Sequence, residues 1–579
     1  MSPFPPSPHG RYTRRASDKP PRIHGELFMN FIKNIFRRKT IGDMLAGVSQ
    51  DGQGLRRVLT ARDLVLLGIG GIIGAGIFAT VGTATVGDTV RPGAGPAIII
   101  SFIITGVACG FTALCYAELS SMVPVSGSAY TYVYLTMGEF IAWIIGWDLM
   151  LEYAIGNVAI AISWAGYFKE LLRGFGITIP AWLVTDFRSA LHGDTIYNAA
   201  QLLMSGASID HIATFNNAGA YIAEQVAGGS TLEKIALGFK NAHDAIALSP
   251  KLFGMPIVFN LPAVCIVALV TTVLYRGIRE SARFNTIMVI LKLMVLAFFV
   301  LVGCFYVKPD NWTPFMPNGW SGIQAGAAIV FFAYLGFDAV STVAEETVNP
   351  RRDLPIGIIG SLVICTVIYV VVAAVLTGMI PLTAFNQSNK AEPLTVAMSF
   401  HRLDWAAGFI ALGSVVAHTA VLIVQQTGQT RIFYSMGRDG LLPRSFAKVH
   451  PRFRTPHVNI LVTGVFVGFF AAFTSIDEMV DLTNVGTLFA FMLVCIGVII
   501  LRKIEPDRER GFRVPFVLGV ALAGIVMCVY LMAGLPAVTF IRFFIWLAVG
   551  SVFYFSYGYW NSRRRQGKVV MPPDELSDH

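Results

Sequence analysis

Leu64–Thr80 reads LVLLGIGGIIGAGIFAT, an apolar stretch long enough for one membrane crossing. Five glycines interrupt it: Gly68, Gly70, Gly71, Gly74 and Gly76. Each glycine costs about 1 kcal/mol relative to alanine in a helix interior, so the backbone is weakest in the middle of the span. An opened helix is tolerated in hydrocarbon only where its freed backbone groups face protein or a water-filled cavity. The stretch therefore predicts either a broken helix beside a polar ligand site or close helix packing through small residues.

The composition places the rest of the chain in the membrane as well. Of 579 residues, 54% are hydrophobic and only 14% are charged, against about 25% charged in soluble proteins, and the mean hydropathy is +0.62. Apolar runs that are each sufficient for one crossing lie near 64–85, 97–121, 130–172, 256–275, 284–307, 322–345, 355–380, 405–436, 457–475, 479–501, 514–534 and 538–558. We therefore predict an all-α polytopic membrane protein with about 12 transmembrane helices, of which the third and eighth exceed the bilayer thickness.

The distribution of Lys and Arg predicts the orientation. If the N-terminus is cytoplasmic, the basic clusters at 276–283, 438–454 and 502–513 all lie on the inner side. The short outer connections then hold only Arg91, Lys308, Lys390, Arg402 and Arg542. This asymmetry follows the positive-inside rule and predicts a multi-pass protein of the inner (plasma) membrane with both termini in the cytoplasm. It also accounts for the net charge of +9 without a nucleic-acid partner, because the charges flank spans instead of forming one face.

The cysteines and the termini complete this outline. All seven cysteines lie within apolar runs without metal-like spacing, so we expect small buried hydrophobes, no metal site and no cofactor. Residues 1–60 are predicted to form a disordered, basic cytoplasmic region, with Met1 or Met29 as the start, and residues 561–579 a cytoplasmic tail. The more polar segment at about 174–255 is predicted to be an outer insertion with short helices near 197–204 and 218–226. It is interpreted either as a tolerated insertion or as a lid or partner surface.

A second weak point occurs in the sixth span, at 325–346. Gly336 interrupts this span, and Asp338, Glu345 and Glu346 place carboxylates deep in it or at its inner end. The first span lies five spans earlier, and transporter folds with inverted repeats have broken helices at corresponding positions. We therefore predict two inverted repeats of five helices, at 61–310 and 311–503, followed by two extra helices at 504–560.

Several motifs resemble those of one family. They are LTARDLVLLGIGGIIGAGIF, CYAELSSMVPVSGSAYTY, GWDLMLEY, FFAYLGFDAVSTVAEETVNPRRDLPIGI and GQTRIFYSMGRDGLLP. Together they resemble the cationic amino acid transporters of the amino acid–polyamine–organocation superfamily, over about residues 55–560 apart from the outer insertion. The resemblance implies a LeuT-like fold and a bacterial amino acid permease that works by proton-coupled alternating access. It leaves open the amino acid, exchange as an alternative to symport, the oligomeric state and an auxiliary membrane subunit.

The resemblance also implies a substrate site at the two breaks. Gly74, Ala75 and Gly76 would hold the α-carboxylate, next to Ile72 and Ile73, because freed N–H groups and a helix N-terminus attract anions. In the sixth span, Phe332, Ala333 and Leu335 would offer carbonyl oxygens to the α-amino group, and the Phe332 ring would act as a gate. Backbone contacts of this kind select the amino acid head group and leave the choice of side chain to other residues.

Buried ionisable residues suggest the coupling machinery. Lys292 lies about eight residues inside the fifth apolar run, where an ammonium is costly and a neutral amine becomes accessible. The resemblance places this lysine where sodium-coupled relatives bind their ion, linking the first helix to the eighth, so we expect it to couple transport to protons; the alternative is a snorkelling lysine. Glu152 and Asp338 are accessory candidates; Glu152 is equally interpretable as bracing packed helices, and Asp338 is interpreted as ordering the bent sixth helix.

The eighth span departs from the family pattern. It reads SVVAHTAVLIVQQTGQTR, with His418, Gln425 and Gln426 where relatives have mostly apolar residues. We expect Gln425 to belong to the substrate site and His418 to be accessory; the alternative is hydrogen bonding between helices. A cationic substrate (arginine, lysine or ornithine) is thereby less firmly implied. An enzyme is not expected, because catalytic and phosphate-binding motifs are missing, whereas a channel or an amino acid sensor of the same fold stays an alternative.

Overall fold

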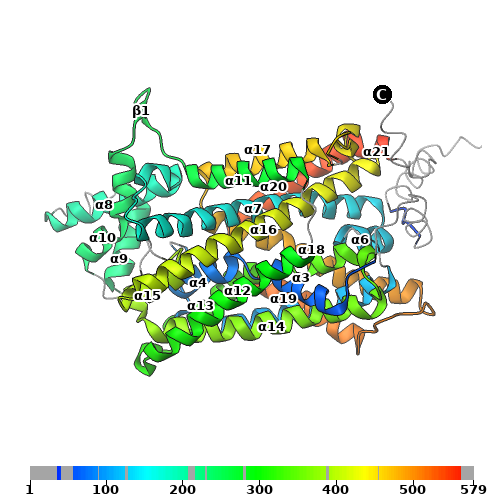
Figure 1. Ribbon diagram of the computed structural model, residues 1–579, viewed down its shortest axis with the longest axis horizontal. Coiled ribbons are helices and arrows are strands. Elements are labelled where there is room, and N and C mark those ends of the chain that lie inside the picture. The colour runs from blue at the N-terminus through cyan, green and yellow to red at the C-terminus, as the bar shows by residue number, and fades with distance from the viewer. Residues whose placement is uncertain are drawn as a thin grey trace, which may run out of the picture.

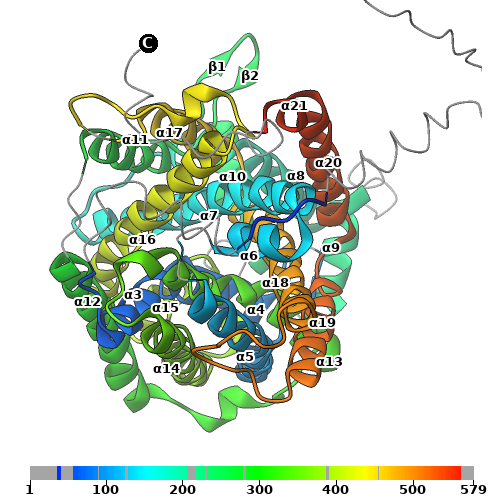
Figure 2. The same ribbon diagram turned by 90° about the vertical axis from the view of Figure 1, so that its right-hand side faces the viewer.

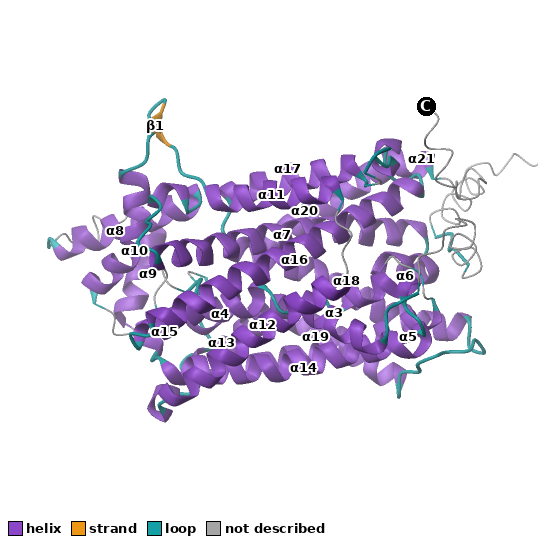
Figure 3. Ribbon diagram, viewed as in Figure 1, coloured by secondary structure: helices purple, strands orange, loops and turns teal. Residues whose placement is uncertain are grey.

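The computed structural model describes residues 36–40 and 57–562, with gaps at 89, 124, 126–127, 207–215, 228–230, 278–281, 386–389 and 454. Most of the predicted N-terminal region and of the C-terminal tail lies outside the described residues, as do Met1 and Met29. The described chain is almost entirely helical (Figure 3). The helices run side by side along the long axis of the molecule (Figure 1).

Twelve helical units occupy the positions of the predicted runs. Among the described residues, eight helices are long and apolar enough to cross a bilayer, and a bent pair makes a ninth. Seven of the eight contain α5 (Ile98–Met122), α7 (Glu139–Gly174), α12 (Ala282–Gly303), α14 (Pro350–Met379), α16 (Asp404–Arg438), α18 (Ile476–Ile504) and α20 (Ala537–Phe553). Three shorter apolar helices complete the set: α11 (Leu261–Arg276), α17 (His457–Phe473) and α19 (Val517–Met532). An all-α polytopic fold is thus confirmed.

The third predicted run is two helices and not one. The short helix α6 (Ser128–Met137) ends just before Gly138, and α7 starts directly after this glycine. Gly138 has a φ of 97°, which glycine adopts readily but which does not occur within an α-helix. The helices α7 and α16 contain 36 and 35 residues, so each is about 50 Å long and exceeds the hydrocarbon core of about 30 Å. They pack along each other and form the central pair of the bundle.

Both predicted breaks are present. The first span consists of α3 (Ala61–Ile72), a π-helical turn η1 (Gly76–Thr80) and α4 (Val81–Val86), and its two halves are bent by 43°. The sixth span consists of α13 (Gly319–Val330) and the 3-10 segments η7 (Phe331–Tyr334) and η8 (Asp338–Glu346). It is the one long helix that was not named among the seven above. The division into inverted repeats at 61–310 and 311–503 stays a prediction.

The outer insertion forms a small helical layer at one end of the bundle (Figure 1). It contains α8 (Phe187–Met204), α9 (Asn216–Ala227) and α10 (Leu232–Ala247), followed by a hairpin of β1 (Lys251–Leu252) and β2 (Met255–Pro256). Both predicted short helices are therefore confirmed, as parts of α8 and α9. The three helices share a small core of their own around Ile196, Tyr221 and Ile235.

The remaining short elements either extend the ends of spans or connect them. They are η2 (Gly95–Ala97), η3 (Ala181–Leu183), η5 (Cys304–Tyr306), η6 (Pro309–Trp312), η9 (Leu382–Ala384), α15 (Pro393–Phe400), η10 (Arg444–Ala447), η11 (Tyr554–Gly558) and α21 (Tyr559–Asn561). Five of the cysteines are buried as expected, but Cys265 and Cys304 are exposed on the outer surface of their helices. That expectation was wrong for these two, because a lipid-facing position suits a small apolar side chain as well as the protein core does.

Candidate functional site

The first break lies at Ile73, between α3 and η1. Ile73 is extended (φ −76°, ψ 103°), and the π-helical turn starts at Gly76. The first N–H groups of a helical segment have no partner within that segment; that those at 74–76 bind an anion stays a prediction. Ile72, Ile73, Gly74, Ala75 and Gly76 are all buried within the bundle.

The second break lies at Leu335 and Gly336, between η7 and η8. Leu335 is extended (φ −61°, ψ 140°), and Gly336 has a φ of 108°, a conformation that strongly favours glycine. Phe332 and Ala333 lie in the tight turn η7 directly before it and are buried. The predicted weak point at Gly336 is therefore the position where the sixth span changes direction.

Glycines also bring the two breaks into contact. A methyl group on Gly71 would lie 3.2 Å from the carbonyl oxygen of Gly336, and a methyl group on Gly76 would overlap the Cα of Ala333. Gly68 has a similar role against α14, because a methyl group there would lie 2.6 Å from the Cβ of Ser361. The break and the close packing thus occur together: Ile73–Ala75 break the helix, and glycines on either side permit close packing. A ligand site at the break stays a prediction.

Tyr369 on α14 joins the two breaks. Its hydroxyl lies 2.9 Å from the carbonyl oxygen of Ile72 and 2.9 Å from that of Ala333, and donates its hydrogen to this pair of acceptors. The side chain is fully buried. Sequence reasoning missed this residue; a tyrosine in the apolar run VIYVVV was the available signal, because a buried phenol usually needs a hydrogen-bond partner.

A cavity of about 510 Å³ extends from the breaks to the side of the bundle on which α3 begins. Its inner end is formed by Gly71, Leu335 and Gly336, and its other end by Leu59 and Pro456. Of the predicted site residues, Leu335, Gln425, Glu152 and Asp338 line it. The remaining ones do not: Ile72, Ile73, Gly74, Ala75, Gly76, Phe332, Ala333, Lys292 and His418.

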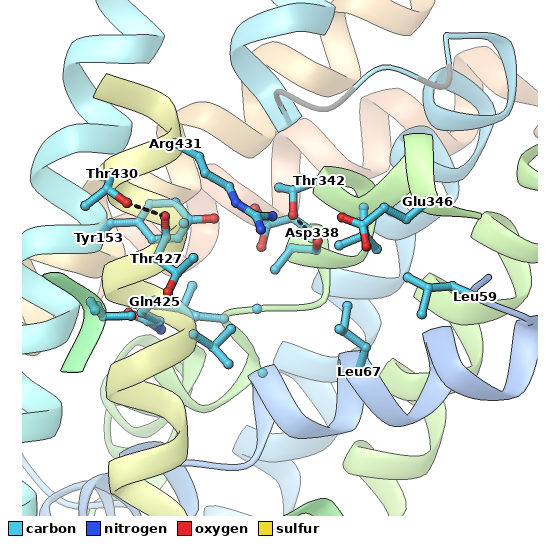
Figure 4. A pocket seen from close by; sticks show the side chains of 18 of the residues that line it. Leu59, Leu67, Tyr153, Asp338, Thr342, Glu346, Gln425, Thr427, Thr430 and Arg431 are labelled. Carbon is cyan, nitrogen blue, oxygen red and sulfur yellow. Dashed lines mark hydrogen bonds between the residues drawn. The ribbon is translucent and has the colours of Figure 1, made fainter. Parts of the chain in front are cut away.

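The cavity has an acidic lining. Asp63, Glu152, Asp338 and Glu346 contribute carboxylates, and Arg431 is the guanidinium among the lining residues. Figure 4 shows Arg431 reaching from α16 towards Asp338 on η8. Such an arrangement favours a ligand that carries at least one positive charge.

The helix α7 carries two buried carboxylates, of which Glu152 lines the cavity and Asp148 does not. In the part of the chain that the structure describes, Oε2 of Glu152 and both carboxylate oxygens of Asp148 are buried without a hydrogen-bond partner. Ser128 donates a hydrogen bond of 3.3 Å to Asp338. Unpaired buried carboxylates are costly, so Glu152 is the accessory residue that most needs a cation, a proton or a ligand.

Lys292 on α12 contacts the first span just before its break. Its Nζ donates a hydrogen bond of 2.7 Å to the carbonyl oxygen of Gly70, and only 2% of the residue is exposed. This position is too deep for a lysine that snorkels to the membrane surface. The role of Lys292 in proton coupling stays a prediction.

The polar residues of the eighth span, α16, have different surroundings. Gln425 lines the cavity, whereas Gln426 donates to the hydroxyl of Thr271 at 2.9 Å. His418 lies 2.8 Å from the hydroxyl of Ser163 and 2.7 Å from the carbonyl oxygen of Ser414. Of the two interpretations, Gln425 thus fits the cavity lining and His418 and Gln426 fit hydrogen bonding between helices; Gln425 and Gln426 differ because successive helical residues point in directions about 100° apart.

Ion pairs join the elements on the other side of the breaks. Arg91 lies 2.6 Å from Asp88 and 2.8 Å from Asp481 on α18, and Lys390 lies 3.0 Å from Asp477 on the same helix. Burial raises the pKa of the Asp88 carboxyl, but Arg91 and Lys390 lower it by more, so this pKa lies below its usual value. The breaks are thus reached by a cavity from one side and covered by paired charges on the other.

Sequence comparisons agree with this architecture. The amino acid permease family model matches residues 59–555, which include the outer insertion. The chain is 42% identical to the methylthioribose transporter of Bacillus subtilis (strain 168) over 91% of this chain and 98% of that protein. It is also 42% identical to the branched-chain amino acid permease BcaP of the same organism, over 92% of this chain and 99% of that protein. Identity to the vacuolar cationic amino acid transporter 2 of Arabidopsis thaliana is 34%, over 83% of this chain and 65% of that protein.

These relatives are transporters and not enzymes. The family match covers both broken spans, the lysine-bearing fifth span and the whole cavity lining except Val58. The chain is a multi-pass membrane protein that belongs to the amino acid permease family of the amino acid–polyamine–organocation superfamily.

Proposed function

We propose that this protein is a secondary active transporter that imports amino acids by alternating access. The observation that supports this proposal is the asymmetry around the two breaks. The cavity leads from the α3 side to Gly71 and Leu335, whereas Arg91 and Asp481 are paired on the opposite side. A carrier needs one site that is open to one side at a time, whereas a conducting channel needs a continuous path.

The two breaks are the proposed binding site for the α-amino acid head group. The N–H groups of Gly74, Ala75 and Gly76 would receive the carboxylate, next to Ile72 and Ile73. The carbonyl oxygens of Phe332, Ala333 and Leu335 would receive the ammonium. The hydroxyl of Tyr369 already bonds the Ala333 carbonyl, but a carbonyl oxygen has a second lone pair for the substrate.

The acidic cavity favours a cationic side chain, such as that of arginine, lysine or ornithine. Glu152 and Gln425 both line the cavity, and Glu152 has an unpaired buried oxygen, so a guanidinium or ammonium would relieve the cost of burying this oxygen. A second candidate substrate class is the branched-chain amino acids, because BcaP is 42% identical over 92% of this chain.

Competition in proteoliposomes tests the substrate class. Proteoliposomes that contain the purified protein are preloaded with unlabelled leucine or arginine, and counterflow is measured as uptake of the labelled amino acid from outside. The competitors added outside are unlabelled arginine, lysine, ornithine, leucine, isoleucine, valine and methylthioribose. We expect the cationic amino acids to compete, and Glu152→Gln to weaken them selectively. Competition by branched-chain amino acids alone would favour the second candidate, and no counterflow with any of them would remove the transporter proposal in favour of a channel or a sensor.

We propose the proton as the coupling ion and Lys292 as the residue that couples it. Lys292 bonds the Gly70 carbonyl, three residues before the break at Ile73, so loss of its proton would change the hydrogen bond that holds this half-helix. Lys292→Met should abolish uptake driven by an inward pH gradient while counterflow persists. Lys308→Met, which removes a lysine outside the spans, should leave both unchanged.

The pH-gradient experiment also separates symport from exchange. An exchanger would show counterflow in wild type without net uptake under a pH gradient, and pH-driven uptake that is undiminished in Lys292→Met would refute the role of this lysine. His418 and Asp338 are proposed to act as accessory residues only, through the helix contacts of α16 and η8 described above. Plasma-membrane insertion with both termini in the cytoplasm is tested by protease accessibility of terminal tags in intact cells.

A further inference from the structure

The hairpin of β1 and β2 has an apolar tip. Its register pairs Leu252 with Met255 and Lys251 with Pro256, so Leu252 and Met255 lie on the same face. Phe253 and Gly254 form the two-residue turn between them. The exposed fractions of Leu252, Phe253 and Met255 are 57%, 94% and 67%. Three large apolar side chains are therefore gathered at the end of a short projection.

The turn residue Phe253 is unusual for its conformation. Both turn residues have positive φ angles, 50° at Phe253 and 81° at Gly254, which is the pattern of a type I′ turn. Asparagine, aspartate or glycine suits the first of these positions, whereas a bulky side chain there is strained. Since 94% of Phe253 is exposed, packing within the described chain does not compensate for this strain.

The base of the hairpin is firmly tied to a membrane span. The N–H of Ile257 donates to the carbonyl oxygen of Pro250 at 2.8 Å, and the N–H of Phe259 to that of Trp182 at 3.0 Å. Asn260 caps α11 through its side chain, so the span starts at Leu261, five residues after Pro256. The short link holds the hairpin at the level where α11 enters the bilayer.

The hairpin also points to the side of the bundle and not along it. In Figure 1 it projects away from the direction of the helices, beside the end of α11. Figure 2, which views the molecule along the helices, shows it extending past the outline of the bundle next to α11 and α17. The N–H of Asn260 donates to the carbonyl oxygen of Ala472 near the end of α17, and Phe469 and Phe473 of α17 are exposed. Exposed apolar side chains next to the start of a span are typical of a lipid-facing surface.

We propose that the tip of the hairpin, Leu252–Met255, inserts into the surface of the bilayer leaflet on the side of α8–α10. The three apolar side chains would lie among the upper acyl chains, and the ammonium of Lys251, on the opposite face, would reach the phosphate groups. The hairpin thus attaches the outer helical layer to the membrane beside α11, in addition to its contacts with the bundle.

Depth-dependent fluorescence tests this insertion with the full-length protein in phosphatidylcholine–phosphatidylglycerol vesicles. Phe253→Cys is introduced after the exposed Cys265 and Cys304 are replaced by alanine, and is labelled with nitrobenzoxadiazole. Met255→Cys is a second site in case the turn variant does not fold. Lys251→Cys is the matched control, because it lies on the same hairpin but faces away from the apolar side chains.

We expect blue-shifted emission at the Phe253 and Met255 sites, strong quenching by lipids that carry a nitroxide near the headgroup, and iodide quenching several-fold weaker than at the Lys251 site. Equal iodide quenching at all three sites, with emission as in water, would refute the proposal. Protection from iodide without quenching by the nitroxide lipids would also refute it, since it would indicate that a second copy or another protein covers the tip.

Discussion

Tyr369→Phe removes the one hydrogen that the carbonyl oxygens of Ile72 and Ala333 share. Both acceptors lie at the breaks, and Tyr369 is fully buried. A buried acceptor left without its donor costs about 1–3 kcal/mol. Because one hydrogen serves both acceptors, we expect a total loss of about 1–2 kcal/mol. If the whole loss fell on substrate binding, the Kd would rise by about 5- to 30-fold, since 1.4 kcal/mol is a factor of ten.

The increase in Kd should be the same for every substrate. The breaks are proposed to bind only the α-carboxylate and α-ammonium, so weakening them should not discriminate between side chains. The assay is equilibrium binding of labelled amino acids to purified protein, combined with thermal unfolding. Substrates identified by counterflow, and shorter or longer analogues of each, should all lose affinity by a similar factor.

Tyr334→Phe is the matched control. Tyr334 is equally buried and lies in η7 next to the second break, but its hydroxyl donates a hydrogen bond of 2.8 Å to the carbonyl oxygen of Phe102 on α5, which is not at a break. We expect a comparable loss of thermal stability with an unchanged Kd. An unchanged Kd in Tyr369→Phe, the same change in Tyr334→Phe, or a change limited to one side-chain class would refute the reasoning.

Two further predictions concern packing and pH. Gly76→Ala should abolish counterflow, because its methyl group would overlap the backbone of Ala333. Gly74→Ala should retain much of the counterflow, because its methyl group would lie 3.2 Å from a side-chain methyl group of Val421 and would not overlap backbone; equal activity of the two variants would contradict this. Asp439, just after α16, pairs with Lys39 at 2.8 Å. Burial raises the pKa of Asp439, but Lys39, Arg438 and the Tyr130 hydroxyl together lower it by more, to below its usual value. The pair therefore stabilises the fold fully above the unfolded-state pKa of about 3.9 and loses this effect as the pH falls through the folded-state pKa. The difference in unfolding temperature between wild type and Asp439→Asn should vanish in acid, and a difference that does not depend on pH would refute the assignment.

Local patterns were sufficient to predict the membrane spans and the breaks. Hydropathy located all twelve helical units, because each span must satisfy its own backbone in lipid and so appears as a continuous apolar run. Glycines located both breaks, because Gly336 adopts a backbone conformation that other residues avoid. The depth of Lys292 was equally clear from its position within a run, and the structure adds its bond to Gly70.

Long-range contacts could not be predicted in the same way. The short run that contains Tyr369 has no periodicity that indicates the breaks of two other spans, and the split of the third run at Gly138 lay within an apolar stretch. The carboxylates of the acidic cavity come from α3, α7 and η8, which are far apart in the chain, and α16 adds Gln425 and Arg431. A single sequence gives the depth of such groups but not the direction in which they point.

Gln425 and Gln426 illustrate this division. The sequence by itself determined that two amides lie deep in the eighth span and need polar partners. Only the tertiary structure decided that Gln425 lines the cavity while Gln426 bonds Thr271 on α11. Adjacent helical residues point about 100° apart, so the role of each depends on which neighbouring helix lies on that side. Hydropathy and backbone preference are local properties that the sequence carries directly, whereas the neighbour on each face of a helix is set by the packing of the whole bundle.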